Sequence, residues 1–390
     1  MGEISDSYSG GTPTAGKSEY YGGDIPFIRS AEVNSDSTEL FLTDEGLKNS
    51  SAKMVNKGDI LYALYGATSG ETGLARLDGA INQAILDIKP HENYDAAFIM
   101  QWLRKSKENI IGTYLQGGQG NLSGSIVTSL MIDCPNHEEQ KLIGEYFQNL
   151  DHLITLHQRK CDETKRLKKY MLQKMFPQNG KKVPEIRFSG FTDDWEQRKL
   201  GDICKMNGRI GFRGYTEKDI ITKEAGGILT FSPTNIVDNQ LTIGVKNTYI
   251  TREKYNESPE IMVQKGNILF VKTGSTLGKS ALVTGIEEDC TVNPQVVVIK
   301  VESNLQKILS VVLTSSPVQK QIAAVKIGGA VPTMTETELK NIDLALPQNV
   351  NERIKIGEYF ENFDNLITLH QRELENLQNI KKFMLEKMFV

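Results

Sequence analysis

Apolar residues recur in alternating steps of three and four along two stretches of the chain, from Phe147 to Met175 and from Phe360 to Met388. This spacing places the apolar side chains on one narrow stripe of an α-helix, so it predicts long helices over residues 137–177 and 349–390. A long helix with a narrow apolar stripe needs a partner that covers the stripe. We therefore expect the two helices to pack on each other, antiparallel, as an intramolecular coiled coil.

The two expected helices are copies of one another. Residues 143–159 read IGEYFQNLDHLITLHQR, and residues 356–372 read IGEYFENFDNLITLHQR. A repeat of about half the chain length indicates an internal duplication. We expect the two halves to be related by an approximate two-fold axis, with their globular segments at opposite ends of the helix pair.

Matching signals flank the two helices. Asn136 with Glu139, and Asn349 with Glu352, have the spacing of a capping pair, in which the Asn accepts from an early backbone N–H and the Glu reaches back. Pro177 cannot continue a helix, so the first helix should end there.

The segments that precede the helices predict mostly β domains. Strand patterns occupy residues 25–33, 57–66 and 79–90, and a helical stretch follows over residues 96–111. The second half repeats this plan with little identity, as MVNKGDIL at 54–61 and MVQKGNIL at 262–269 show. The expected fold class is α+β, with two diverged, mostly β domains over residues 1–136 and 201–348 and the two long helices after them.

Residues 178–200 form a linker and lead-in between the halves. Their Pro, Gly and Lys content predicts an exposed linker that leads into Trp195 and the second domain. Aligning GDI at 201–203 with GEI at 2–4 predicts that the first domain lacks a corresponding lead-in and that the chain is shortened at its N-terminus.

The distribution of charge indicates which partners the chain is expected to need. The net charge is −4, and residues 1–136 carry 10 Lys and Arg against 17 Asp and Glu. Residues 201–350 are nearly balanced, with 16 basic and 15 acidic side chains. Because DNA affinity depends on neutralising phosphates, we expect weak binding of duplex by this chain alone and a partner that supplies basic surface. The lack of an apolar run of membrane length and of a leader at Met1 predicts a cytoplasmic protein without a membrane contact.

Catalytic signals are weak. Residues 274–280, GSTLGKS, approach a phosphate-binding loop, but the glycine spacing is one residue short, so a turn after a strand is the preferred interpretation. The four cysteines have no metal-ligand spacing and are interpreted as free thiols, with no metal site expected. No convergent set of acids, bases or nucleophiles stands out.

The order of segments resembles the specificity subunit of type I restriction-modification enzymes. The resemblance rests on the repeated IGEYF…LITLHQR helices, the lead-in VPEIRFSGFTDDWEQRKLGDI, and KGDIL before a glycine loop. It implies a non-catalytic subunit whose two target-recognition domains read a bipartite, asymmetric site in double-stranded DNA, with the helices as a spacer. It also implies two methylation subunits, which hold S-adenosylmethionine while this chain binds no cofactor, and additional restriction and translocation subunits.

Candidate DNA contacts are polar or basic residues at expected strand ends and loops, because such side chains reach base edges and phosphates. In the first domain they are Arg29, Ser30, Tyr65, Ser69, Arg76, Asn82 and Gln83. In the second domain they are Arg209, Arg213, Asn235, Lys272, Ser275, Lys279 and Gln295.

Two other classes of function stay open. The chain could be a coiled-coil scaffold protein whose globular ends bind protein partners, which binding indifferent to DNA sequence would favour. It could also belong to a restriction enzyme with its own nuclease, but no PD…ExK motif is visible in the sequence.

Overall fold

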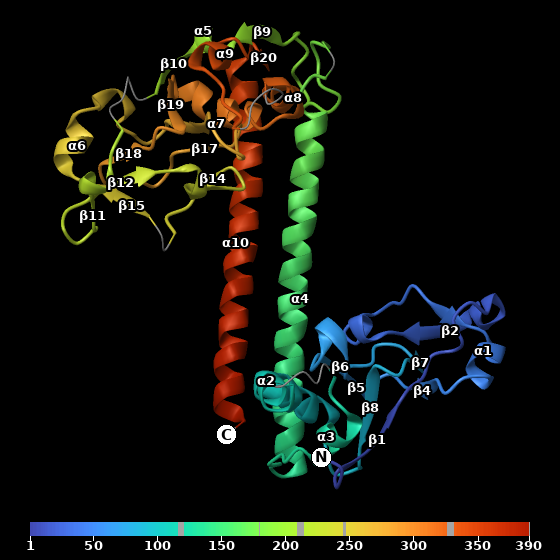
Figure 1. Ribbon diagram of the computed structural model, residues 1–390. Coiled ribbons are helices and arrows are strands. Elements are labelled where there is room, and N and C mark those ends of the chain that lie inside the picture. Colours follow the sequence, from blue (N-terminus) through green and yellow to red (C-terminus); the bar gives the residue numbers. More distant parts are fainter. Residues whose placement is uncertain (116–120, 179, 209–213, 245–246, 326–330, 390) are drawn as a thin grey trace. The chain divides into compact units, whose positions relative to one another are not determined.

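The computed structural model describes residues 1–115, 121–178, 180–208, 214–244, 247–325 and 331–389 (Figure 1). The chain forms two compact units. The first unit contains Met1–Arg159 and Gln371–Val390, and the second contains Lys160–His370. The long helices α4 (His137–Lys174) and α10 (Val350–Met388) therefore each contribute to both units.

The first unit is built on two four-stranded sheets. One has the order β1-β8-β5-β6 and is antiparallel throughout, and the other has the order β3-β2-β7-β4 with β2 and β7 parallel. The strands are β1 (Ser5–Ser9), β2 (Tyr21–Ile28), β3 (Phe41–Leu42), β4 (Lys53–Val55), β5 (Ile60–Ala63), β6 (Thr72–Leu74), β7 (Gly79–Ile81) and β8 (Ile85–Pro90). The helices before α4 are α1 (Asp44–Lys48), α2 (Ala96–Tyr114) and α3 (Gly124–Ser129).

Strand β5 is buried on both faces because its side chains alternate between two cores. Ile60 and Tyr62 pack with α2 and α4 in one hydrophobic cluster, whereas Leu61 and Ala63 pack with residues of the second sheet. This explains why the strand reads as an unbroken apolar run in the sequence. The strands expected near residues 25–33 and 57–66 and the helix expected at 96–111 are confirmed, and the run at 79–90 forms two strands, β7 and β8.

The second unit repeats this plan. Its sheet β10-β19-β16-β17 has the same order as β1-β8-β5-β6, and its sheet β11-β15-β12-β18 contains the parallel pair β12 and β18. The strands are β9 (Glu196–Lys199), β10 (Cys204–Asn207), β11 (Ile220–Ile221), β12 (Ile228–Phe231), β13 (Ile236–Val237), β14 (Gln240–Leu241), β15 (Thr248–Ile250), β16 (Ile268–Val271), β17 (Ser280–Leu282), β18 (Cys290–Val292), β19 (Val296–Val301) and β20 (Asp343–Leu346). The shorter helices are α5 (Leu200–Ile203), α6 (Arg252–Asn256), α7 (Ser303–Val312), α8 (Ser316–Val325) and α9 (Glu336–Lys340).

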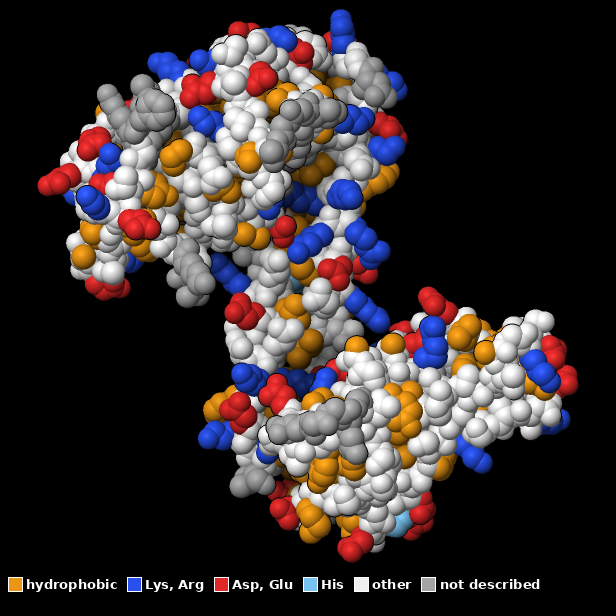
Figure 2. Space-filling model, viewed as in Figure 1, with side chains coloured by type: hydrophobic (Ala, Val, Ile, Leu, Met, Phe, Trp, Pro, Cys, Tyr) orange, Lys and Arg blue, Asp and Glu red, His pale blue; other side chains and the backbone are white. Residues whose placement is uncertain are grey.

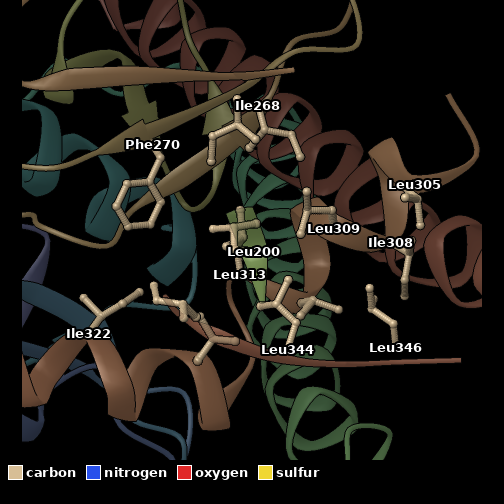
Figure 3. Close-up of a cluster of buried hydrophobic side chains, with 14 of the residues drawn as sticks. Leu200, Ile268, Phe270, Leu305, Ile308, Leu309, Leu313, Ile322, Leu344 and Leu346 are labelled. Atoms are coloured by element: carbon tan, nitrogen blue, oxygen red, sulfur yellow. The ribbon is translucent and has the colours of Figure 1, made fainter. Parts of the chain in front are cut away.

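Strand β16 divides its side chains between two cores in the same way as β5. Ile268 and Phe270 join the cluster shown in Figure 3 together with leucines of α7, while Leu269 and Val271 face the second sheet of the unit. The expectation that the two domains share a fold and have diverged in sequence is therefore confirmed.

The two long helices pack antiparallel within each unit. In the first unit, the ring centroids of Phe147 and Phe389 lie 5.9 Å apart, and Asp151 accepts from Lys381 Nζ at 2.5 Å. In the second unit, the ring centroids of Phe360 and Phe176 lie 5.9 Å apart, and Asp364 accepts from Lys168 Nζ at 2.5 Å. The residues of these two sets occupy equivalent positions of the repeat, so the duplication preserves both an aromatic contact and an ion pair.

The helix starts differ from the expected matching caps. Asn136 Oδ1 accepts from Glu139 N at 3.0 Å, as expected, but Asn349 Oδ1 accepts from Asn351 N instead of Glu352 N. Glu352 is fully buried and holds Arg187 through two bonds of 2.7 and 2.9 Å. The expected role of Glu352 as a capping residue is wrong, because the charge of Arg187 draws its carboxylate away from the backbone.

The lead-in segment is more buried than its composition suggests. Trp195 is 2% exposed, and its ring packs edge-on at 5.8 Å from Phe176. Strand β9 then pairs antiparallel with β20, which makes the lead-in part of the second unit. Pro177 lies just after the last residue of α4, Lys174, as expected for a residue that ends a helix. None of the helices in the described part of the chain is long and apolar enough to cross a bilayer.

Candidate DNA interface

A groove of about 580 Å³ lies on the second domain where several strands end. The turn after β12, the loop between β16 and β17, and the residue before β19 line it. Its polar groups are mostly hydroxyls and amides, with one ammonium group. The lining residues are Ser232, Pro233, Thr234, Ile236, Val237, Thr273, Gly274, Ser275, Thr276, Lys279 and Gln295.

The glycine loop of this groove is a tight turn between two strands. Gly274 and Gly278 have φ values of 107° and 93°, a region that side chains disfavour. Leu277 between them is 3% exposed and anchors the loop, so Ser275 and Lys279 stay at the surface. Because the antiparallel strand β17 follows the loop, the preferred interpretation of residues 274–280 as a turn is confirmed.

The structure brings three of the seven candidates in the second domain together. Ser275, Lys279 and Gln295 line the groove, and all three are exposed. Asn235 does not line the groove and is 4% exposed; its Oδ1 accepts from Ser232 N, and its Nδ2 donates to the carbonyl of Thr242 and to Asn247 Oδ1. That bonding makes Asn235 a support for the turn that carries the groove hydroxyls.

Lys272 does not line this groove. Lys272 is half-buried, and its backbone N–H donates to the carbonyl of Gln295 at 2.8 Å. Arg209 and Arg213 fall outside the described residues.

The candidates of the first domain are more dispersed. Ser69 is 6% exposed and donates to the carbonyls of Gly66 and Leu64, so its hydroxyl holds its own turn. Asn82 Oδ1 accepts from Ala84 N, and Gln83, which is exposed, accepts from Thr12. Tyr65 is half-buried, and its backbone forms an isolated antiparallel β-bridge with Asn121.

Arg29 forms ion pairs with two nearby carboxylates. Its guanidinium lies 2.7 Å from Glu32 and 3.3 Å from Glu39. Burial favours a raised pKa for the carboxyl of Glu32, but the hydrogen bonds from Arg29 outweigh burial and lower it. Ser30 is half-buried at the start of the short 3₁₀ helix η2 (Ser30–Glu32) that this pair closes.

Arg76 is exposed and lines a separate cavity of the first unit, together with basic residues that the sequence pattern did not single out. Three groove hydroxyls of the second domain, those of Ser232, Thr234 and Thr273, were missed as well. Their position directly after a strand, as in FSPTN at 231–235, is the local signal that could have identified Ser232 and Thr234.

The charges of the visible face are mixed. Figure 2 shows Lys and Arg side chains interspersed with Asp and Glu over the domains, and several Lys and Arg side chains over α4. In the described residues, no cluster of three His, Cys, Asp or Glu side chains could hold a metal ion. Burial raises the pKa values of the Cys204 and Cys290 thiols to about 12, so both stay protonated at neutral pH.

Comparison with known proteins gives one consistent family. A model described as the type I restriction modification DNA specificity domain matches residues 1–166 and 192–379. The type I restriction enzyme MjaVIII specificity subunit of Methanocaldococcus jannaschii is 22% identical over 338 residues, covering 84% of this chain and 77% of that protein. The EcoR124I/EcoR124II specificity subunit of Escherichia coli is 26% identical over 162 residues, covering 39% of this chain and 40% of its own length.

Solved structures share the fold. The S subunit of a type I restriction-modification system from M. genitalium matches with a TM-score of 0.68 at 15% identity, covering 100% of this chain and 94% of that chain. A chain from a structural study of assembly and conformational transition in a type I system matches with a TM-score of 0.51 at 16% identity, covering 100% of this chain and 96% of that chain.

Proposed function

Because the chain belongs to the type I restriction-modification DNA specificity family and recognises DNA sequence in such a system, we propose that each of its two units reads one half of a split, asymmetric site in double-stranded DNA. The observation that carries this proposal is the unequal divergence of the duplication. The helices keep the same contacts in both units, whereas the domains keep their sheets and differ in the side chains at the strand ends. Two readers of one fold with different surfaces suit two different half-sites.

In the second domain, the groove beside the glycine loop is the proposed reading surface. Its hydroxyl and amide groups can donate to and accept from base edges, and Lys279 can contact a phosphate. The loop is held by buried Leu277, so the groove is preformed and needs little ordering on binding.

The partners follow from apolar side chains that the helices expose at equivalent positions of the repeat. Exposed apolar side chains are frequent at interaction sites, and the same chemistry presented once in each unit fits two copies of one partner. We infer that these partners are two methylation subunits. The exposed residues are Leu153, Ile380 and Phe383 in the first unit and Leu366, Leu167 and Tyr170 in the second, with exposed fractions between 39% and 57%.

The chain itself is proposed to be a non-catalytic subunit that acts in the cytoplasm. Among the described residues that line the groove, no nucleophile is paired with a base, and the single ammonium group suits phosphate binding. Methyl transfer with S-adenosylmethionine is proposed to occur in the methylation subunits. DNA cleavage and translocation are assigned to restriction subunits that join the complex.

The test is to co-express the chain with a methylation subunit from its own operon and to map modified adenines across the host genome. The expected result is a split motif with two unlike halves. Methylation without a defined motif, or binding indifferent to DNA sequence, would favour the alternative of a coiled-coil scaffold protein, which the comparisons do not favour.

The partner stoichiometry has its own test. Native mass spectrometry should find two methylation subunits per chain, and Phe383→Asp should reduce this to one because it places a charge in only one of the two apolar sets. Lys382→Asp, next to Phe383, is the matched control and should retain two copies. Full assembly of the Phe383→Asp variant would rule out this surface.

A further inference from the structure

A cavity of about 430 Å³ concentrates positive charge in the otherwise acidic first unit. It is open to solvent on one side and is lined by the turn before β5, the turn after β6, helix α2 and helix α4, all within that unit. Its charged lining has four basic residues and one acidic residue. These residues are Lys57, Arg76, Arg104, Arg159 and Asp151.

The floor of the cavity is a fixed hydrogen-bond network. Arg104 donates to the carbonyl of Thr72 at 2.8 Å, to Asp151 at 2.9 Å and to Asn34 Oδ1 at 2.6 Å. Asp151 also accepts from Lys381 at 2.5 Å. One carboxylate therefore faces two cations, and the floor keeps an excess of positive charge.

The rim adds cations that the fold does not neutralise. Lys57 and Arg76 are exposed, and neither has an ion-pair partner among the described residues. Arg159 lies 3.6 Å from Asp36, but both side chains are more than 60% exposed, so the pair is screened by solvent.

The corresponding cavity of the second unit is balanced. It has a volume of about 260 Å³, and its four charged residues form two ion pairs, Lys168 with Asp364 and Lys307 with Glu361. Where Arg76 follows β6 by two residues, Thr284 follows β17. The duplicated scaffold does not require free cations at this place, so those of the first unit point to an anionic ligand.

We propose that this cavity binds a backbone phosphate of the DNA beside the half-site that the first unit reads. The proposal rests on the function proposed above, because a phosphodiester is the anion that a DNA-recognising chain meets. Guanidinium and ammonium groups are the usual partners of phosphate oxygens. Phosphate contacts position a protein and carry no sequence information, so the cavity contributes affinity and register while the recognised bases are read elsewhere.

The experiment measures the salt dependence of DNA binding by the assembled complex with its methylation subunits. Lys57→Ala and Arg76→Ala should each lower the magnitude of the slope of log affinity against log salt, and together by about 0.9, the value for one phosphate contact. Lys307→Ala, in the balanced cavity of the second unit, is the matched control and should leave the slope unchanged. Thermal melting should show that the exposed residues Lys57 and Arg76 do not affect folding.

Two outcomes would overturn the proposal. Unchanged salt slopes for both Lys57→Ala and Arg76→Ala would remove the cavity from the DNA interface. A change in the methylated motif caused by Arg76→Ala would make Arg76 a reader of bases. In both cases the wild-type complex would still methylate a split motif, so the proposed function would stand, whereas failure of the wild-type complex to recognise any motif would contradict that function itself.

Discussion

At the scale of single residues, equivalent positions of the duplication serve different purposes. Glu139 is exposed near the start of α4, whereas its counterpart Glu352 is fully buried against Arg187. The hydrogen bond with Glu352 raises the pKa of Arg187, so the guanidinium stays charged. A near-identical helix sequence therefore does not guarantee identical surroundings.

The buried pair predicts that replacing one partner lowers the free energy of unfolding more than replacing both. Arg187→Leu should lower the free energy of unfolding of the second unit by about 3–5 kcal/mol, because it leaves a buried carboxylate without a partner. Adding Glu352→Leu should recover much of the loss, since the uncompensated charge is then removed. Urea titration measures both variants, and Glu139→Leu is the exposed control. A single variant as stable as the wild type would contradict the assignment.

The buried carboxyl group of Asp87 predicts that the stability of the folded protein depends on pH. Its side chain is fully buried in β8, 3.7 Å from Lys89 Nζ, and burial raises its pKa to about 6. Because an unfolded Asp has a pKa of about 3.9, the folded state binds the proton more tightly, and stability falls as the pH rises from about 4 to 6. Asp87→Asn should therefore stabilise the protein by ~2 kcal/mol at pH 8 and by much less at pH 4. Equal gains at both pH values in thermal melts would contradict this account.

The groove of the second domain predicts unequal roles for its two nearby lysines. Lys279→Ala should weaken DNA binding by the assembled complex and reduce the salt slope by about 0.9, because Lys279 is exposed at the rim. Lys272→Ala should have a smaller effect on the slope, since that side chain is half-buried and does not line the groove. Equal slopes for Lys279→Ala and the wild type would exclude the glycine loop from the interface.

At the scale of elements, the long helices are paired by charge as well as by apolar packing. Asp364 with Lys168 in the second unit and Asp151 with Lys381 in the first unit occupy equivalent positions. Placing one acid and one base at these positions of each helix favours the antiparallel register, because a shifted pairing would leave partly buried charges unmatched.

A charge exchange tests this register. Asp364→Lys should destabilise the second unit by about 2 kcal/mol, because it places two ammonium groups together. The double variant Asp364→Lys with Lys168→Asp should recover more than half of that loss. The same exchange at Asp151 and Lys381 should recover less, since Asp151 also binds Arg104 and Gln101. Equal recovery at both places in denaturant titrations would show that those extra bonds contribute little.

At the scale of the whole molecule, the two halves of the duplication share the same helix pairing and differ in the domains proposed to read DNA. Exchanging residues 201–348 for the corresponding domain of a relative should change one half of the methylated motif and leave the other half unchanged. Genome-wide mapping of modified adenines measures this outcome. Changes in both halves would mean that the two readers do not act independently.

The local patterns of the sequence were sufficient for the elements and their pairing. The helices of 38 and 39 residues, their antiparallel pairing and the mostly β character of the domains follow from short-range periodicity and from the repeat. Periodicity is readable because each side chain's direction depends on its own position in a helix or strand.

Only the tertiary structure decided which polar side chains face a ligand. Ser69 and Asn235 stand in turns, as the sequence predicts, yet both point inward and support those turns. Lys57, Arg76 and Arg159 lie far apart in the sequence and meet in one cavity. Such groups come together because elements distant along the chain pack on one another, and no local sequence pattern specifies that packing. The sequence by itself therefore determined the scaffold, whereas the tertiary structure decided its binding surfaces.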